Sequence, residues 1–184
     1  MILRAVEDAD LIRNARRGEV EAYNLLISRW EKRVYNYLLR IVGEREEALD
    51  LSQDVFLKAY QNLRKLEDPA RFGPWLFRIA HNEAFSAFRK RRPEVETPPD
   101  LAADEVAADQ AAFPIELSIA VATALSRLNQ EQREAVILKI YQGFKFEEIA
   151  EILACPVSTV KSRLYTALDV LKGQLAPLKS RGVT

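Results

Sequence analysis

Apolar side chains recur at helical spacing along most of the chain, and the clearest stripes lie in its first half. Between Gly18 and Gly43, residues 19–42 carry one such stripe: Ala22, Leu25, Leu26, Trp30, Val34, Tyr37, Leu38 and Ile41. Residues 46–63 repeat apolar residues at steps of four, at Leu51, Val55, Ala59 and Leu63. Residues three or four positions apart lie on one side of an α-helix, so each stripe predicts a helix with one buried side. The same pattern predicts further helices over residues 8–17, 74–91, 115–128 and 130–141.

Residues 146–164 predict two short helices joined by a tight turn. Proline is favoured in the first turn of a helix, so Pro156 marks the start of the second one. Its predicted buried stripe is Val160, Leu164, Leu168 and Leu171. The other side carries groups that can reach phosphates and base edges in a major groove: Ser158, Thr159, Lys161, Ser162 and Arg163. The alternative is a plain helical hairpin with a solvated polar side.

No stretch of useful length alternates as a strand does, so we expect an all-α protein with two helical domains, residues 1–92 and 119–184. Between them, residues 93–118 carry seven acids, no bases and several prolines, which is typical of a flexible acidic linker. This segment is either a solvating spacer or a nucleic-acid mimic that lies in a basic channel of a partner.

Composition excludes several classes of protein. We expect no membrane insertion and no signal peptide, because no apolar run approaches about 18 residues, and we therefore place the chain in the cytoplasm. The single cysteine, Cys155, excludes an internal disulfide, and with a single histidine no Cys/His metal cluster can form. We expect no cofactor and no small-molecule substrate. Although the net charge is zero, the charge is unevenly distributed along the chain, since the linker is acidic and both flanking blocks are basic.

Residues 72–92 interleave aromatic and basic residues. Phe85 and Phe88 add aromatic surface beside cationic and hydrogen-bonding groups, namely Arg78, His81, Asn82, Arg89 and Lys90. Rings that stack on unpaired bases, with cations along the backbone, are typical of single-strand binding. The alternative is an amphipathic core helix with a basic end.

Three motifs in order resemble those of extracytoplasmic-function (ECF) sigma factors, the smallest class of the bacterial primary sigma family. DLSQDVFLKAY (50–60) resembles the region 2 helix that binds the polymerase clamp. FGPWLFRIAHNEAFSAFRKRR (72–92) resembles the segment that recognises and melts the −10 element. Residues 125–164 resemble region 4, which reads the −35 element. The resemblance implies that residues 1–92 form region 2 and residues 119–184 form region 4.

The resemblance also implies partners and site residues. It implies binding to the clamp and flap of core RNA polymerase, to promoter DNA and to an anti-sigma factor. Polymerase contacts are expected at Asp50, Gln53, Asp54 and Phe56, of which the first three share one helix side. Contacts with a flipped −10 base are expected near Asp68, Ala70 and Arg71, with Asn82 below them. Contacts with the −35 element are expected at Ser158, Thr159, Lys161, Ser162 and Arg163.

Some positions depart from the family pattern, and they leave an alternative open. Ser86 stands where an acidic residue is common, Asn129 where proline is usual, and Thr166 where arginine is common; Ala154 and Pro156 replace the usual Gly and Ser of the turn. The alternative function is a sigma-like regulatory module that docks polymerase or DNA without initiating. A helical enzyme using His81 with Glu83 is disfavoured, because residues two apart point to different sides of a helix.

Overall fold

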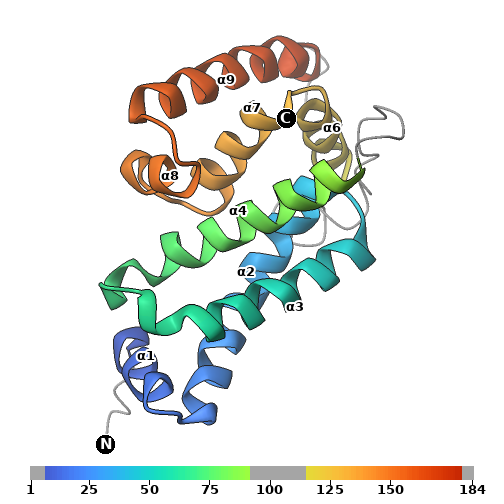
Figure 1. Ribbon diagram of the computed structural model, residues 1–184. Coiled ribbons are helices and arrows are strands. Elements are labelled where there is room, and N and C mark those ends of the chain that lie inside the picture. The colour runs from blue at the N-terminus through green and yellow to red at the C-terminus, as the bar shows by residue number, and fades with distance from the viewer. Residues whose placement is uncertain (1–6, 92–114, 180–184) are drawn as a thin grey trace, which may run out of the picture.

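The computed structural model describes residues 7–91 and 115–179, and within these ranges all regular structure is helical (Figure 1). The first half contains α1 (Asp8–Arg16), α2 (Val20–Val42), α3 (Arg45–Asn62), the short helices η1 (Leu63–Lys65) and η2 (Pro69–Arg71), and α4 (Phe72–Arg91). The second half contains α6 (Ile115–Ser126), α7 (Gln130–Val136), the π-helical turn η4 (Ile137–Tyr141), α8 (Phe146–Ile152) and α9 (Val157–Lys179). The predicted all-α class is confirmed.

Local capping explains where α2 ends and α3 begins. Gly43 adopts φ 78°, a left-handed conformation that favours glycine, and its N–H donates to the carbonyl oxygen of Leu39 at 2.8 Å. The next residue, Glu44, caps α3 by accepting hydrogen bonds from the backbone N–H groups of Glu46 and Glu47 at 3.0 and 2.7 Å. The chain therefore turns back on itself within three residues.

The apolar stripe predicted for α3 is buried throughout, at Leu51, Val55, Ala59 and Leu63. This stripe packs α3 between α2 and α4. On α2 the stripe holds with one exception, because Leu25 is 51% exposed. The first turns of α2 bury Ala22, Tyr23 and Leu26 instead, which leaves Leu25 on the outer side of the helix.

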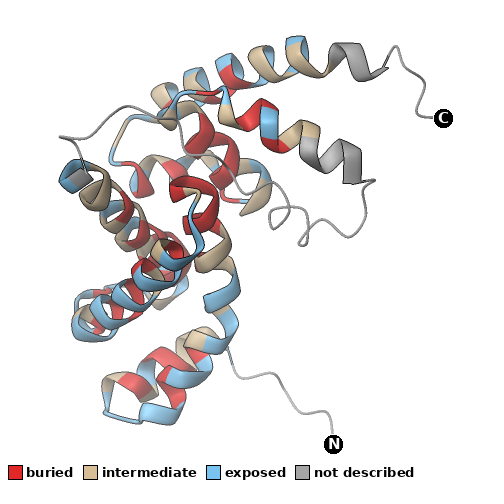
Figure 2. Ribbon diagram, turned by 90° about the vertical axis from the view of Figure 1, so that its right-hand side faces the viewer, coloured by how far each residue is buried: buried red, intermediate tan, exposed pale blue. Residues whose placement is uncertain are grey.

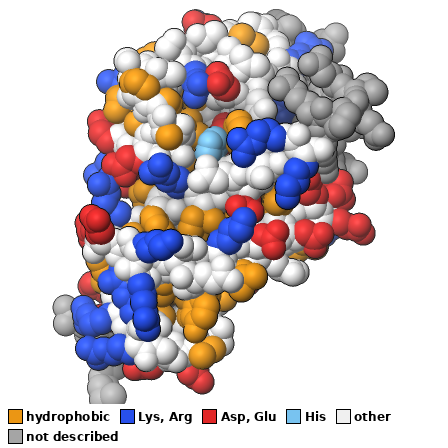
Figure 3. All heavy atoms as spheres, in the orientation of Figure 1, with side chains coloured by type: hydrophobic (Ala, Val, Ile, Leu, Met, Phe, Trp, Pro, Cys, Tyr) orange, Lys and Arg blue, Asp and Glu red, His pale blue; other side chains and the backbone are white. Residues whose placement is uncertain are grey.

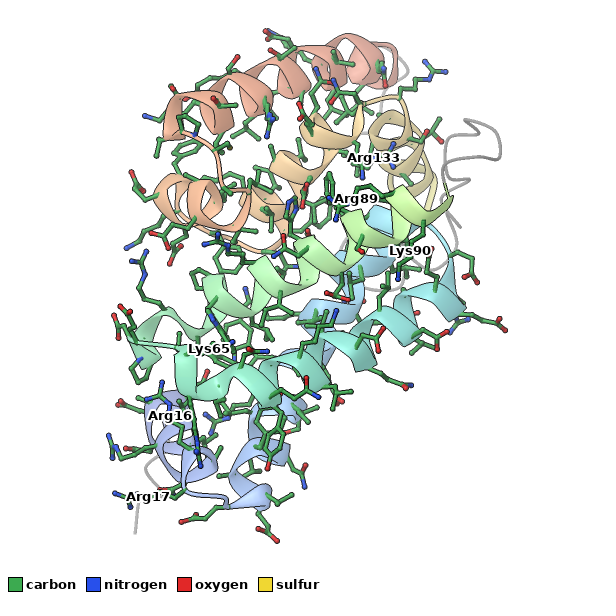
Figure 4. All side chains as sticks on the ribbon, viewed as in Figure 1. Arg16, Arg17, Lys65, Arg89, Lys90 and Arg133 are labelled. Carbon is green, nitrogen blue, oxygen red and sulfur yellow. The ribbon has the colours of Figure 1, made fainter. Side chains whose placement is uncertain are left out.

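A basic residue of α1 forms hydrogen bonds with the segment that leads into α4. The guanidinium of Arg16 donates to the carbonyl oxygens of Leu63, the first residue of η1, at 3.2 Å, and of Leu66, which follows η1 (Figure 4). The carboxylate of Asp68 then accepts from the N–H of Ala70 at 2.9 Å and caps η2. As a result α4 begins at Phe72, two residues before the predicted start.

The predicted helix over residues 115–128 is present as α6, Ile115–Ser126, whose sequence is rich in Ala and Leu and favours helix. Its first turn coincides with the end of the expected linker, residues 93–118. The remainder of the expected linker, residues 93–114, lies outside the described residues. Asn129 starts α7 through a reciprocal capping box with Gln132, which explains how the turn forms without proline.

The predicted pair of helices around Pro156 is present as α8 and α9. Ala154 adopts φ 50°, and the N–H of Cys155 donates to the carbonyl oxygen of Ala150 at 3.0 Å, which closes the turn. Val160 and Leu164 are buried as expected. The prediction was wrong for Leu168, which is 39% exposed, because the buried stripe of α9 continues through Ala167 instead.

The two halves share one hydrophobic core. It runs from α1 through α4 and continues into Ile137, Phe144 and Ile149, while a smaller cluster under α9 includes Leu125 and Leu164 (Figure 2). α8 packs against α4, and α7 contacts α2, so α9 lies beyond α7 and α8 (Figure 1). Within the described residues, no helix combines the length and apolar character that crossing a bilayer requires.

Candidate polymerase and nucleic-acid interfaces

A polar ridge runs along the outer side of α3. Asp50, Gln53 and Asp54 are all exposed, as their spacing predicted. In the space-filling view, acidic side chains gather near the amino-terminal end of α3, whereas Lys and Arg side chains spread over the face that carries α1 and α4 (Figure 3). The face thus separates an acidic surface from a basic one, and each suits a partner of opposite charge.

An apolar groove of about 800 Å³ lies beside this ridge, between α2 and α3. Its walls include four large apolar side chains that are more than 40% exposed: Val20, Leu49, Leu57 and Tyr60. Phe56, which we expected to contact polymerase, is only 8% exposed and lines this groove as part of the core. Its carbonyl oxygen accepts a hydrogen bond from the hydroxyl of Tyr23 at 2.5 Å, which ties α3 to α2.

The loop predicted to hold a flipped base adjoins a small hollow of about 350 Å³. Ala70 lines it, together with the rings of Trp30, Phe72 and Phe144. Gly73 is required here, because a Cβ at this position would come within 2.7 Å of the Trp30 ring. Asp68 is exposed but already caps η2.

The predicted −10 residues of α4 divide into two groups. Arg78, Asn82, Arg89 and Lys90 are exposed, and the last two lie toward the carboxyl end of α4 (Figure 4). His81 instead stacks on Phe85, with ring centroids 4.2 Å apart, and its Nδ1 lies 2.7 Å from Oε1 of Glu134 in α7.

The site also contains a buried carboxylate that sequence reasoning missed. Glu134 is 1% exposed, and its Oε1 accepts a second hydrogen bond, from the hydroxyl of Tyr37 in α2, at 2.5 Å. Burial, and then the charge and hydrogen bond of Glu134, hold the pKa of Tyr37 well above its ordinary value. No local pattern could have indicated this pair, because 97 residues separate its members.

The enzyme alternative required His81 and Glu83 to act together. Their side chains have different partners, because the Glu83 carboxylate forms an ion pair with Lys58 of α3 at 2.6 Å, whereas His81 faces Glu134. The structure therefore directs the two side chains to different neighbouring helices.

The polar side of α9 is presented outward at its amino-terminal end. Ser158, Lys161 and Ser162 are exposed, and Thr159 is half-buried. The Lys161 ammonium lies 5.4 Å from the centre of the Phe146 ring, which positions it by a cation–π contact.

Arg163 differs from Lys161 because its partners are a carboxylate and a thiol rather than an aromatic ring. Its guanidinium donates to Oε1 of Glu131 at 2.7 Å and lies 3.7 Å from the Sγ atom of Cys155. Burial raises the pKa of the Cys155 thiol, and the charge of Arg163 partly opposes that rise. Of these two cations, Lys161 is therefore the more available to DNA.

Two sigma-factor family models match the chain, one in its first half and one in its second half. Sigma-70 region 2 matches residues 26–94, and sigma-70 region 4 matches residues 118–171. The chain is 30% identical to the ECF RNA polymerase sigma-E factor of Escherichia coli K12, over 95% of this chain and 97% of that protein. The chain belongs to the ECF RNA polymerase sigma factors. Like other sigma factors of this class, it recognises promoters for RNA polymerase.

Further relatives cover both regions of this sigma factor. It is 29% identical to the RNA polymerase sigma-H factor of Pseudomonas aeruginosa, over 96% of this chain and 98% of that protein. The solved structure of CnrH in complex with the cytosolic domain of CnrY is 27% identical, with a TM-score of 0.71, covering 92% of this chain and 97% of that one. The sigma factor RpoE of Bartonella quintana, solved with the anti-sigma factor NepR, is 26% identical, with a TM-score of 0.70 and coverage of 84% and 96%.

Proposed function

We propose that this sigma factor binds core polymerase through α3, reads the −10 element with η2 and α4, reads the −35 element with α9, and promotes strand separation without catalysis of its own. Region 2 would comprise residues 1–92 and region 4 residues 119–184, joined by a linker at 93–118. The protein would act in the cytoplasm, where polymerase and promoter DNA are found. We also propose that it belongs to the wider primary sigma family. The separation of the acidic α3 ridge from the basic α4 face carries this proposal (Figure 3).

The polymerase contact would combine charge with apolar burial. The exposed carboxylates of Asp50 and Asp54 suit a basic partner surface, and the neighbouring α2–α3 groove offers apolar side chains that a partner helix can cover. The groove is lined by residues of α2 and α3, and the flap would be contacted by region 4. Phe56 would support this interface mainly as the floor of the groove.

The −10 contact would use the hollow beside η2 for an extruded base and the exposed cations of α4 for the strand. Opening duplex costs a few kcal/mol per base, and stacking on aromatic rings returns about 1–3 kcal/mol per base. The half-buried ring of Trp30 offers such a surface next to Ala70, in a hollow that the buried rings of Phe72 and Phe144 also line. Arg78, Arg89 and Lys90 would then contact phosphates.

The −35 contact would place the start of α9 in the major groove. Lys161 and Ser162 are exposed there, and Ser158 and Thr159 lie in the first turn of the helix, where backbone N–H groups favour a phosphate. Arg163 would join this contact by exchanging its bond to Glu131 for one to DNA.

An anti-sigma factor is a further proposed partner. Two similar solved structures are complexes, one naming the cytosolic domain of CnrY and one naming the anti-sigma factor NepR. The exposed apolar groove between α2 and α3 offers such a partner a surface that would compete with polymerase.

Binding to core polymerase tests the α3 assignment. We expect Asp50→Ala, Gln53→Ala and Asp54→Ala, combined in one protein, to weaken binding by at least about tenfold, because central contacts carry most interface energy. Gln61→Ala is the matched control, since Gln61 is exposed on the last turn of the same helix. Equal affinity of the triple variant and the control would refute the assignment.

The alternative, a regulatory module that does not initiate, predicts a different outcome in transcription. Such a protein would bind polymerase normally but open no promoter. Its only support is the set of departures at Ser86, Ala154 and Thr166, and Ala154 completes a well-formed turn between α8 and α9.

A further inference from the structure

Phe146, the first residue of α8, contacts two ammonium groups from different elements through its ring. The Nζ atom of Lys139 in η4 lies 4.7 Å from the ring centre, and the Nζ atom of Lys161 in α9 lies 5.4 Å from it. We expected Lys161 to contact the −35 element, whereas the sequence pattern gave no indication of a role for Lys139. The ring therefore brings an expected DNA-binding cation together with a second cation.

These two positive charges lie close enough to repel each other. They are no farther apart than the sum of their distances to the ring, which is close to the Debye length of about 10 Å in 0.1 M salt, so salt screens the repulsion only in part. Among the residues that the structure describes, neither lysine forms an ion pair with a carboxylate. The ring offsets part of the repulsion, and an anion that contacts both ammonium groups would offset more of it.

The ring is a fixed platform, and both lysines keep donors for an anion. Phe146 is half-buried and packs against both apolar clusters of the protein, and α8 packs on α9 (Figure 1). The ammonium of Lys139 donates one hydrogen bond, to the carbonyl oxygen of Phe144 at 3.0 Å, and a lysine ammonium has three donors. Lys161 is exposed, and Lys139 is half-buried beside it at the same ring.

A DNA phosphate is the anion that the proposed −35 contact brings to this place. Lys161 and Ser162 are exposed at the end of α9 that we place in the major groove, and the phosphates of the duplex border that groove. Lysine binds a phosphate as a compact point charge, so it needs no planar partner.

We propose that Lys139 and Lys161, held by the ring of Phe146, bind one phosphate of the −35 duplex between them. Lys139 is then a further DNA contact of region 4, and Phe146 is a positioning residue that acts through both lysines. This inference rests on the proposed −35 role of α9.

The charge of Lys139 is tested by the salt dependence of binding. The holoenzyme is bound to a duplex that carries the −35 element of a promoter opened by the wild type, over a series of salt concentrations. We expect K139M to weaken binding about tenfold and to reduce the slope of log affinity against log salt concentration by about one, whereas K139R should keep both. K172M is the matched control, because Lys172 is exposed about 16 Å farther along α9.

A neutral methylphosphonate, placed in turn at each linkage of this duplex, locates the phosphate. For the wild type, one linkage should weaken binding about tenfold when it is neutral. K139M and K161M should each reduce that effect to less than about threefold, and both should do so at the same linkage. Sensitivity at two different linkages would show that the lysines do not share a phosphate.

Phe146 is tested against its two lysines. F146L keeps an apolar side chain for the core but removes the ring, and we expect it to weaken binding at least about threefold. It should have no further effect in a K139M/K161M protein, whereas a merely structural defect would weaken binding in both backgrounds. F146Y keeps the ring and should retain wild-type affinity.

Three outcomes would overturn the proposal: an unchanged salt slope in K139M, separate linkages for the two lysines, or an equal effect of F146L with and without them. Failure of the underlying function looks different. In that case the wild-type holoenzyme binds the −35 duplex no more tightly than a duplex of scrambled sequence, before any variant is compared.

Discussion

Removing one hydroxyl, with Tyr37→Phe, would test the buried link between the two regions. The Tyr37 side chain is fully buried, and its hydroxyl donates to the carboxylate of Glu134 at 2.5 Å. A hydrogen bond to a charged group contributes about 1.5–3 kcal/mol, and its loss leaves the carboxylate with His81 as its remaining described partner from region 2. For a chain of 184 residues, a loss of about 2 kcal/mol lowers the melting temperature by about 4–8 °C.

The assay is thermal and urea unfolding, followed by circular dichroism. Tyr35→Phe is the matched control, because it removes the same hydroxyl from the same helix at a half-buried position beside the α2–α3 groove. We expect the control to change the free energy of unfolding by less than about 0.5 kcal/mol. A core shared by both regions also predicts a single cooperative transition in the wild-type protein.

Equal stability of the two Phe variants would refute this reasoning. It would mean that the Tyr37 hydroxyl and Glu134 do not interact in solution, and therefore that the regions do not meet as described. Two separate transitions in the wild-type protein would lead to the same conclusion.

Three further predictions concern titration and DNA binding. Burial raises the pKa of Tyr23 and Tyr37 above the ordinary value, so their stabilising contribution is complete below about pH 10 and declines at higher pH; absorbance titration should show these two tyrosines ionising only as the protein unfolds. Lys161→Ala should weaken binding of the holoenzyme to the −35 duplex. It should also reduce the slope of log affinity against log salt concentration by about one, whereas an unchanged slope would show that Lys161 contacts no phosphate. Burial raises the pKa of Cys155, so its alkylation rate should rise at a higher pH in the native protein than in urea, and identical pH profiles would contradict this.

The sequence predicted those features that depend on neighbours along one helix. The steps of four in α3 correctly predicted burial of Leu51, Val55 and Ala59, because helical periodicity alone places them on one side. The exposed ridge of Asp50, Gln53 and Asp54 followed from the same spacing. Their contacts with polymerase stay a prediction, as do the DNA contacts of α4 and α9.

Features that depend on distant partners could not be predicted in this way. Leu25 and Leu168 fit apolar stripes but are exposed, because α2 buries Ala22, Tyr23 and Leu26 and α9 buries Ala167 in their place. Glutamate is usually exposed to solvent, yet Glu134 is buried, because Tyr37 and His81 from two other helices supply its hydrogen bonds. Such contacts are determined by how the two regions pack, and no spacing within one segment encodes that.

The most direct test of the proposed function is to mix the purified protein with bacterial core polymerase and a pool of randomised promoters, and to sequence the DNA recovered in open complexes. The account predicts a two-part motif with fixed spacing, whose upstream part is lost on combining Lys161→Ala with Arg163→Ala. Polymerase binding without opened DNA would contradict initiation and favour the regulatory module. Absence of polymerase binding would contradict the account as a whole.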